Sequence, residues 1–161
     1  MIEHPTLRAC GVGHSFGTRG DALPPGAVRP RQVHGARVAS AAECAAGIDA
    51  LRREAQGAPL RAVIGPHIGP CCYEVDAPVL DALRHFDADL DAATTASRPG
   101  HHWLDLGALA RSALLRAGVS PDAIGSVERP CTHCDAQRFH SYRRDGARAG
   151  RLVHWIVAAN P

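Results

Sequence analysis

The sequence predicts a single domain, residues 1–161, of the α/β class with mixed α+β layers. Short β-branched runs bounded by glycine and proline alternate along the chain with amphipathic segments at helical spacing. This alternation is typical of layered α/β and α+β proteins. A chain of 161 residues buries roughly two thirds of its unfolded surface on folding, which is enough to support its own core.

The first half of the chain predicts two strands and one helix. Gly11–Phe16 is a candidate strand, and a proline-rich connector follows it. Ser40 and Glu43 form a capping box for a helix that extends to Gln56, because each side chain can bond to backbone N–H groups at the helix start. Arg61–Ile64 is expected to be a strand.

The second half predicts two further helices and a final strand. Asp76 begins a helix that runs to Phe86, and residues 87–100 are expected to form a polar loop. Asp105 begins the next helix, which ends at Gly118. The apolar run Leu152–Ala158 predicts a buried strand.

The composition excludes several function classes. All 18 basic residues are arginine, so the chain has no lysine for a Schiff base, a phosphate loop or general-base catalysis. The net charge of +2 is spread along the sequence, which argues against nucleic-acid or membrane-surface binding. No signal peptide or apolar stretch of membrane-spanning length is evident, so a cytoplasmic protein with reduced cysteines is expected.

The segment Val63–Val75 is the most unusual in the chain. Its two Gly-Pro pairs predict tight turns, followed at once by Cys71, Cys72, a tyrosine and a carboxylate. Adjacent cysteines on extended backbone point to opposite sides, so at most one of the two is expected to face a common site.

A second cysteine motif, Cys131-Thr-His-Cys134, has the C-x-x-C spacing of half a zinc site or of a redox pair. The sequence contains no second C-x-x-C, and the adjacent pair Cys71-Cys72 has the wrong spacing to complete the site. A zinc ribbon is therefore disfavoured. A thioredoxin-like pair is disfavoured as well, because that motif opens a helix after a strand, whereas here it follows Pro130 and leads into Phe139. Most cysteines are expected to be buried thiols.

Three further side chains are candidates for binding. His34, in Gln-Val-His-Gly, precedes a glycine that permits close approach of a ligand, although a lone histidine is more often a core or surface residue. Arg143 and Arg144 are expected to face opposite sides of an extended segment. One of them could then bind a phosphate or carboxylate while the other pairs with Asp145 or solvent, and a surface salt bridge is the alternative.

These segments together resemble the YfiH-like laccase-domain family, also described as multicopper polyphenol oxidase, peptidoglycan editing factor or purine nucleoside phosphorylase. The resemblance covers nearly the whole chain, from about Gly11 to Ile156. The motifs that carry it occur in the family's order: His14–Arg19, Gln32–Gly35, Ile64–Val75, Leu104–Leu106 and Cys131–Gly146.

The resemblance implies a layered α/β fold with mixed sheets and a zinc-centred enzyme. Its substrates would be a purine nucleoside and phosphate, with phosphorolysis of adenosine or inosine and, in some members, deamination of adenosine. Copper-dependent phenol oxidation is the older family label. The implied metal ligands are a histidine in Q-x-H-G, a cysteine in A-D-C and a histidine in H-A-G-W-R-G, and His34 matches the first of these.

The chain departs from the family pattern after Val38. It passes directly into residues 39–51, which resemble the helix that follows H-A-G-W-R-G, so the segment with the other two ligands is missing. The resemblance therefore implies a laccase-type domain that is truncated in the middle. The candidate replacement ligands are His14, His67, Cys72 and Cys131, and a second chain of a homo-oligomer is the other possible source.

This departure leaves three hypotheses for the function of the chain. The chain is a compact zinc enzyme with Arg143 or Arg144 available to phosphate, or it is a catalytically inactive relative, a pseudoenzyme that serves as a scaffold or binds a partner. The third hypothesis is a cysteine hydrolase that uses Cys72 or Cys131 together with a histidine.

Overall fold

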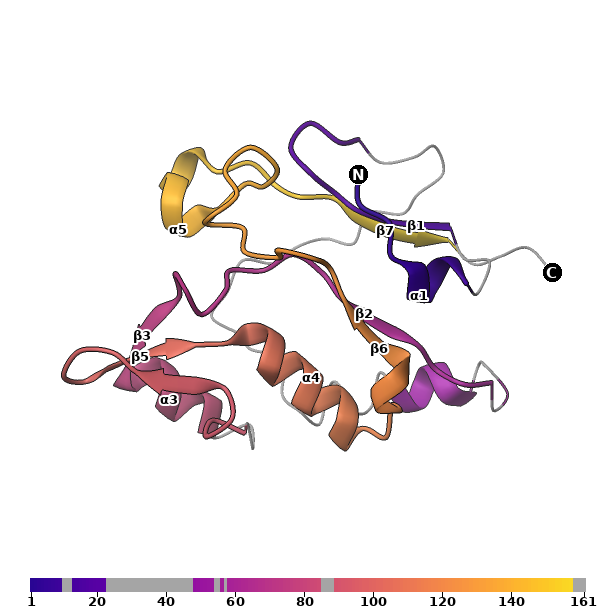
Figure 1. The fold of residues 1–161 in the computed structure, drawn as a ribbon, viewed down its shortest axis with the longest axis horizontal. Helices are drawn as coiled ribbons and strands as arrows, with labels where there is room; N and C mark the ends of the chain where they lie inside the picture. The colour runs from indigo at the N-terminus through magenta and orange to yellow at the C-terminus, as the bar shows by residue number, and fades with distance from the viewer. Residues whose placement is uncertain (10–12, 23–47, 54–55, 57, 85–88, 158–161) are drawn as a thin grey trace.

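The computed structural model describes residues 1–9, 13–22, 48–53, 56, 58–84 and 89–157 (Figure 1). Residues 48–53 are helical and lie within the predicted helix, whose capping box and Gly57 lie outside the described residues. Gln56, with φ of +50°, is a turn residue, so the predicted helix end at Gln56 is too late. The elements in chain order are α1 (Pro5–Arg8), β1 (Gly13–Phe16), β2 (Ala62–Ile64), β3 (Glu74–Asp76), α3 (Ala77–Arg84), β4 (Thr94–Ala96), β5 (His101–Leu104), α4 (Leu106–Arg116), η1 (Pro121–Ala123), β6 (Ile124–Ser126), α5 (Tyr142–Asp145), η2 (Gly146–Arg148) and β7 (His154–Val157).

Strands β1 and β7 form an antiparallel pair from the two ends of the described chain. Gly13 lies opposite Val157, and Phe16 lies opposite His154. The terminal strand is therefore confirmed, but the expectation that it is buried is wrong, since Ile156 is 64% exposed. An antiparallel pair can leave one face open to water, so the apolar composition of β7 does not ensure that its side chains are buried.

Strands β2 and β6 form a parallel pair in the middle of the molecule (Figure 1). Ala62 lies opposite Ile124 and Ile64 opposite Ser126. Helix α4 packs against β2, and α1 contacts both β1 and β2. The pair matters for the candidate site because the chain leaves β2 into the Gly-Pro turns and leaves β6 toward Cys131.

A three-stranded antiparallel sheet, in the order β3-β5-β4, lies at one end of the molecule (Figure 1). The predicted loop over residues 87–100 is wrong in part, because Thr94–Ala96 is a strand that pairs with β5. Two β-branched threonines favour extended backbone there. Gly100, with φ of +76°, occupies the left-handed conformation in the turn before β5.

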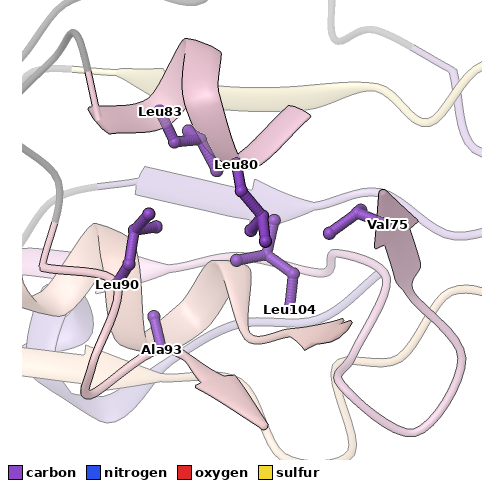
Figure 2. Packing of buried hydrophobic residues seen from close by; sticks show 6 residues of the cluster. All are labelled: Val75, Leu80, Leu83, Leu90, Ala93 and Leu104. Atoms are coloured by element: carbon purple, nitrogen blue, oxygen red, sulfur yellow. The ribbon is translucent and has the colours of Figure 1, made fainter. Parts of the chain in front are cut away.

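A small apolar core fills the space between α3 and this sheet (Figure 2). Leu104, at the end of β5, is 1% exposed. The next residue, Asp105, accepts a hydrogen bond from the Ala108 N–H at 2.9 Å, which confirms it as the predicted N-cap of α4. The buried members of the core are Val75, Leu80, Leu83, Leu90, Ala93 and Leu104.

No helix in the described ranges is long and apolar enough to cross a bilayer.

Candidate functional site

Four cysteine side chains meet beyond the ends of β2 and β6. Their Sγ atoms all lie within 4.8 Å of one another, and the group consists of Cys71, Cys72, Cys131 and Cys134. The Sγ of Cys71 is 3.6 Å from that of Cys131 and 3.5 Å from that of Cys134, and the Sγ of Cys72 is 3.3 Å from that of Cys134. We call this group the four-cysteine cluster.

A turn after Gly69 directs both adjacent cysteines into the cluster. The N–H groups of Cys72 and Tyr73 each donate to the Gly69 carbonyl, both at 3.0 Å. The expectation that only one of the pair can face a common site is therefore wrong. It assumed extended backbone, on which neighbouring side chains alternate, whereas the backbone here is a tight turn.

Backbone hydrogen bonds hold the two cysteine segments together. The His67 N–H donates to the Pro130 carbonyl at 2.9 Å, and the Thr132 N–H donates to the His67 carbonyl at 2.8 Å. His67 and Cys131 thus form a parallel bridge that extends the β2–β6 pairing. The pairing supplies the second half of the C-x-x-C site that spacing alone did not reveal.

Cys131 differs in acidity from Cys71 and Cys72. Burial raises the pKa of Cys71 to about 11 and also raises the pKa of Cys72. Burial opposes ionisation of Cys131 as well, but the backbone N–H groups of Gly69 and Cys134 donate to its sulfur and lower its pKa to about 7. Cys131 therefore carries substantial thiolate character at neutral pH, which suits metal binding or nucleophilic chemistry.

Two hollows lie beside the cluster and share Arg143 as a wall. The first is lined by Cys71 and Cys72 together with Glu74, Asp76, Arg98, His101, Trp103 and His133. The second is more apolar and is lined by Ile68, Tyr73, Leu106, Ser141 and Tyr142. The Arg143 guanidinium lies 5.1 Å from the centre of the Tyr73 ring, a cation–π arrangement, and is exposed to solvent.

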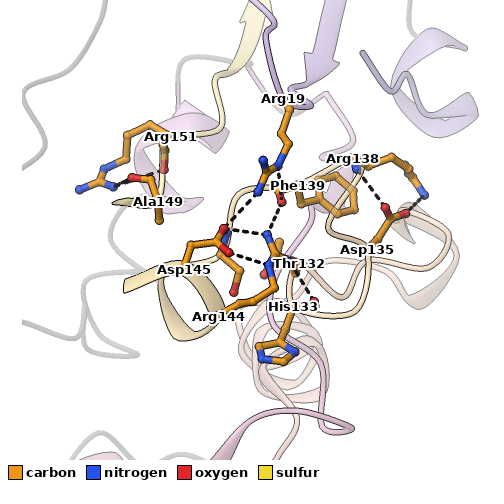
Figure 3. Close-up of polar contacts among 12 residues, drawn as sticks. Arg19, Thr132, His133, Asp135, Arg138, Phe139, Arg144, Asp145, Ala149 and Arg151 are labelled. Atoms are coloured by element: carbon orange, nitrogen blue, oxygen red, sulfur yellow. Dashed lines mark hydrogen bonds and ion pairs between the residues drawn. The ribbon is translucent and has the colours of Figure 1, made fainter. Parts of the chain in front are cut away.

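Arg144 is directed into the protein (Figure 3). Its Nε and one Nη bind both oxygens of Asp145 at 2.8 Å, and its remaining N–H groups donate to the carbonyls of Thr132, His133 and Phe139 at 2.8–2.9 Å. A guanidinium has five N–H donors, and all five are engaged. The backbone here is helix α5, not the extended segment that was expected. Substrate binding by Arg144 stays a prediction that would require it to release one of these acceptors.

Of the other predicted metal ligands, the two cysteines lie in the four-cysteine cluster, whereas the two described histidines make hydrogen bonds to the backbone. Cys72 and Cys131 lie in the cluster. The buried His14 accepts the His4 N–H through Nε2 at 2.8 Å, and His67 donates through Nδ1 to the Gly65 carbonyl at 2.8 Å. His34 lies outside the described residues, so its role as a metal ligand stays a prediction.

The donor set of the described chain differs from the one that the resemblance implies. Across the described ranges, the single group of three or more possible ligand side chains consists of four thiols and contains no histidine. A histidine–cysteine–histidine zinc site is therefore not assembled by these residues. The parallel pairing of β2 with β6 and the His67–Cys131 bridge bring the two cysteine segments together. The Gly69 N–H, 62 positions before Cys131, also donates to the Cys131 sulfur. Neither contact can be read from the spacing of the cysteines.

Acid is expected to destabilise the region around Arg144. The hydrogen bonds from Arg144 hold the pKa of Asp145 below its ordinary value of 3.8. The unfolded chain then binds this proton more tightly, so the stabilisation is present above the unfolded pKa and is lost as pH falls through the folded pKa. Thermal unfolding followed by circular dichroism should show Tm falling between about pH 5 and about pH 3.

Asp145→Asn should make this dependence on pH shallower, whereas the exposed Asp122→Asn should leave it unchanged. Equal slopes in the wild type and Asp145→Asn would contradict the assignment.

The fold and the site define a mixed α/β protein with a thiol-rich centre at the end of a parallel strand pair. A family model described as multi-copper polyphenol oxidoreductase laccase matches residues 44–159. The chain therefore belongs to the laccase-domain family.

Curated relatives and solved structures agree with this family. A purine nucleoside phosphorylase of Xylella fastidiosa is 45% identical over 101 residues, which are 60% of this chain and 37% of that protein. The purine nucleoside phosphorylase YlmD of Bacillus subtilis is 38% identical over 95 residues, 59% of this chain and 34% of that protein. The chain thus corresponds to little more than a third of their length.

Two solved structures share the fold. The Bacillus licheniformis hypothetical protein YfiH aligns with a TM-score of 0.63 and 35% identity over 71% of this chain and 43% of that one. YlmD from Geobacillus stearothermophilus aligns with a TM-score of 0.61 and 34% identity over the same shares of the two chains. The predicted laccase-domain fold is confirmed.

Proposed function

We propose that this chain binds a purine nucleoside and phosphate and splits the nucleoside into free base and ribose 1-phosphate. Two relatives with this activity in their names share 45% and 43% of the aligned residues. The observation that carries the proposal is the position of Arg143, which stands between an aromatic hollow and a polar hollow lined by arginine, histidine and carboxylate side chains.

The aromatic hollow suits a purine base. Tyr73 and Tyr142 offer flat faces on which a base can stack, and Ile68 and Leu106 supply an apolar floor. Its volume of about 630 Å³ lies within the range of about 300–1,000 Å³ that is typical of small-molecule sites.

Arg143 is the residue best placed to receive phosphate. Arg98, in the neighbouring hollow, is already paired with Glu74, with its Nη2 at 2.9 Å from a carboxylate oxygen. Arg143 makes a long hydrogen bond of 3.5 Å to the Glu74 carbonyl, which leaves further N–H donors for an anion. The planar guanidinium can bind two phosphate oxygens at once.

The chemistry follows from this placement. A phosphate oxygen forms the new bond to the anomeric carbon of ribose while the bond from that carbon to the base nitrogen breaks. The base leaves with the electron pair and takes a proton. Arg143 holds the phosphate against the sugar, so that the attacking oxygen is positioned before the bond breaks.

Zinc dependence is part of the proposal, with His34 as the ligand that the family pattern supplies. The described residues gather four thiols rather than the partners that His34 requires, so we assign no step of the reaction to that metal. Zinc content and activity of His34→Ala test this part separately.

Arg143→Ala is expected to lower kcat/KM for phosphorolysis of inosine by about 10-fold to 100-fold, the effect of losing a hydrogen bond to a charged group. Release of hypoxanthine in phosphate buffer measures it, and adenosine serves as a second substrate. Arg148→Ala, an exposed arginine that lines neither hollow, is the matched control and should keep wild-type rates.

Equal rates for the wild type and Arg143→Ala would contradict the assignment of Arg143. No free base from the wild-type protein with either nucleoside would contradict phosphorolysis. That result would favour the inactive relative that acts as a scaffold.

A further inference from the structure

We propose that the four-cysteine cluster binds one zinc ion through four thiolates and is a structural centre of this chain. The proposal is separate from nucleoside chemistry and from His34. It concerns Cys71, Cys72, Cys131 and Cys134, which two distant segments bring together.

The sulfur positions match tetrahedral coordination. Zinc–sulfur bonds are about 2.3 Å long, which places the sulfurs of a tetrahedral site about 3.8 Å apart. The close Sγ–Sγ distances here are 3.3, 3.5 and 3.6 Å, and every pair lies within 4.8 Å. Small adjustments of the side-chain rotamers bring all four sulfurs onto one ion.

Protein contacts hold the backbone around the cluster. The two turns are joined by the His67–Pro130 and Thr132–His67 hydrogen bonds, and the Gly69 N–H donates to the Cys131 sulfur at 3.3 Å. A Cβ at Gly69 would lie only 3.3 Å from the Cβ of Cys131, so the absence of a side chain there lets the two turns approach. Both halves of the ligand set are therefore held in place by protein contacts.

Arg144 supports the second turn. Its Nη1 donates to the carbonyls of Thr132 and His133, the two residues between Cys131 and Cys134. These bonds fix the conformation of the C-x-x-C loop from outside the ligand shell, which is how outer residues orient metal ligands.

Charge around the cluster is compatible with such a centre. Binding releases the thiol protons to solvent, and four thiolates on Zn²⁺ carry two net negative charges. Arg143 and His133 line the hollow that also contains Cys71 and Cys72. These groups place hydrogen-bond donors on the same side as the sulfurs, and Glu74 and Asp76 in the same hollow offset part of the arginine charge.

The donor set indicates a structural rather than a catalytic ion. Four protein ligands complete a tetrahedral shell, whereas catalytic zinc keeps one position open for water or substrate. Four thiolates in tetrahedral arrangement suit zinc or iron, and two disulfides are the redox alternative.

Metal analysis by mass spectrometry tests the proposal on protein purified under reducing conditions. The wild type is expected to hold about one zinc more per chain than the double variant Cys131→Ser/Cys134→Ser. His34→Ala should keep this zinc, and so should Cys10→Ser, which changes a cysteine outside the cluster and outside the described residues. Equal zinc in the wild type and the double variant, or iron in place of zinc, would overturn the proposal.

A second measurement uses only the wild-type protein, so its outcome does not depend on whether a cysteine variant folds. Cobalt(II) added to metal-stripped wild-type protein should produce the strong sulfur-to-cobalt charge-transfer absorption and visible bands of a tetrahedral thiolate site. Zinc should then displace the cobalt and raise Tm. A spectrum without sulfur-to-cobalt absorption, or disulfides among these four cysteines in the reduced preparation, would contradict a zinc–thiolate centre.

Discussion

Replacing Phe139 by alanine is expected to lower the free energy of unfolding by about 3–5 kcal/mol, the usual cost of removing a fully buried aromatic ring. The ring is 0% exposed, and the Arg138 guanidinium lies 4.8 Å from its centre. Its backbone carbonyl also accepts hydrogen bonds from Arg19 at 3.1 Å and from Arg144 at 2.8 Å. A cavity at Phe139 would therefore loosen contacts that converge from three segments.

Urea denaturation of the wild type and Phe139→Ala measures this effect. Tyr142→Ala is the matched control, because this aromatic residue lies three positions away and is 71% exposed. We expect the control to stay within about 0.5 kcal/mol of the wild type. Similar losses for the two variants would contradict the assignment of Phe139 to the core.

Arg144→Ala is expected to lower Tm by at least about 5 °C, whereas Arg143→Ala should leave Tm almost unchanged. The neighbouring arginines differ in their surroundings. Arg144 uses all five N–H groups on Asp145 and three carbonyls, and their loss leaves those half-buried acceptors without a partner. Arg143 is exposed against Tyr73.

Differential scanning calorimetry of both variants at neutral pH measures the contrast. Arg144→Lys provides a finer test, since an ammonium group has three donors and cannot reproduce the planar five-bond pattern. We expect it to recover only part of the loss. Full recovery by lysine, or equal Tm values for the two alanine variants, would show that the hydrogen-bond pattern is not what stabilises this loop.

Local signals in the sequence predicted much of the fold. Asp105 as an N-cap, the helix after Asp76 and the strand before the Gly-Pro turns each depend on neighbouring residues and were correctly placed. The strand Thr94–Ala96 was missed because polar threonines next to small residues resemble a loop until a partner strand is known. The exposure of Ile156 was missed for the opposite reason, since an apolar run shows preference for burial but not whether a neighbour covers it.

The candidate site was harder to predict because it depends on contacts between distant segments. Each cysteine motif was identified, but Cys71 and Cys72 were assigned to extended backbone, and their distance in sequence from Cys131 concealed their proximity. The signal that could have corrected this was Gly69-Pro70, a turn signature directly before the pair. Arg144 was recognised as a possible partner of Asp145, but its three carbonyl acceptors were invisible without the fold.

The pairing of β1 with β7 has a consequence for how the chain is made. The Gly17 N–H, just after β1, donates to His154 Nδ1, a residue 137 positions later. During synthesis β1 leaves the ribosome long before its partner strand exists, so the pair forms only after translation has passed β7. Such long-range closure slows folding and leaves strand edges open to other chains in the interval. Production of the protein should therefore benefit from slow expression and from chaperones that shield β1 until β7 arrives.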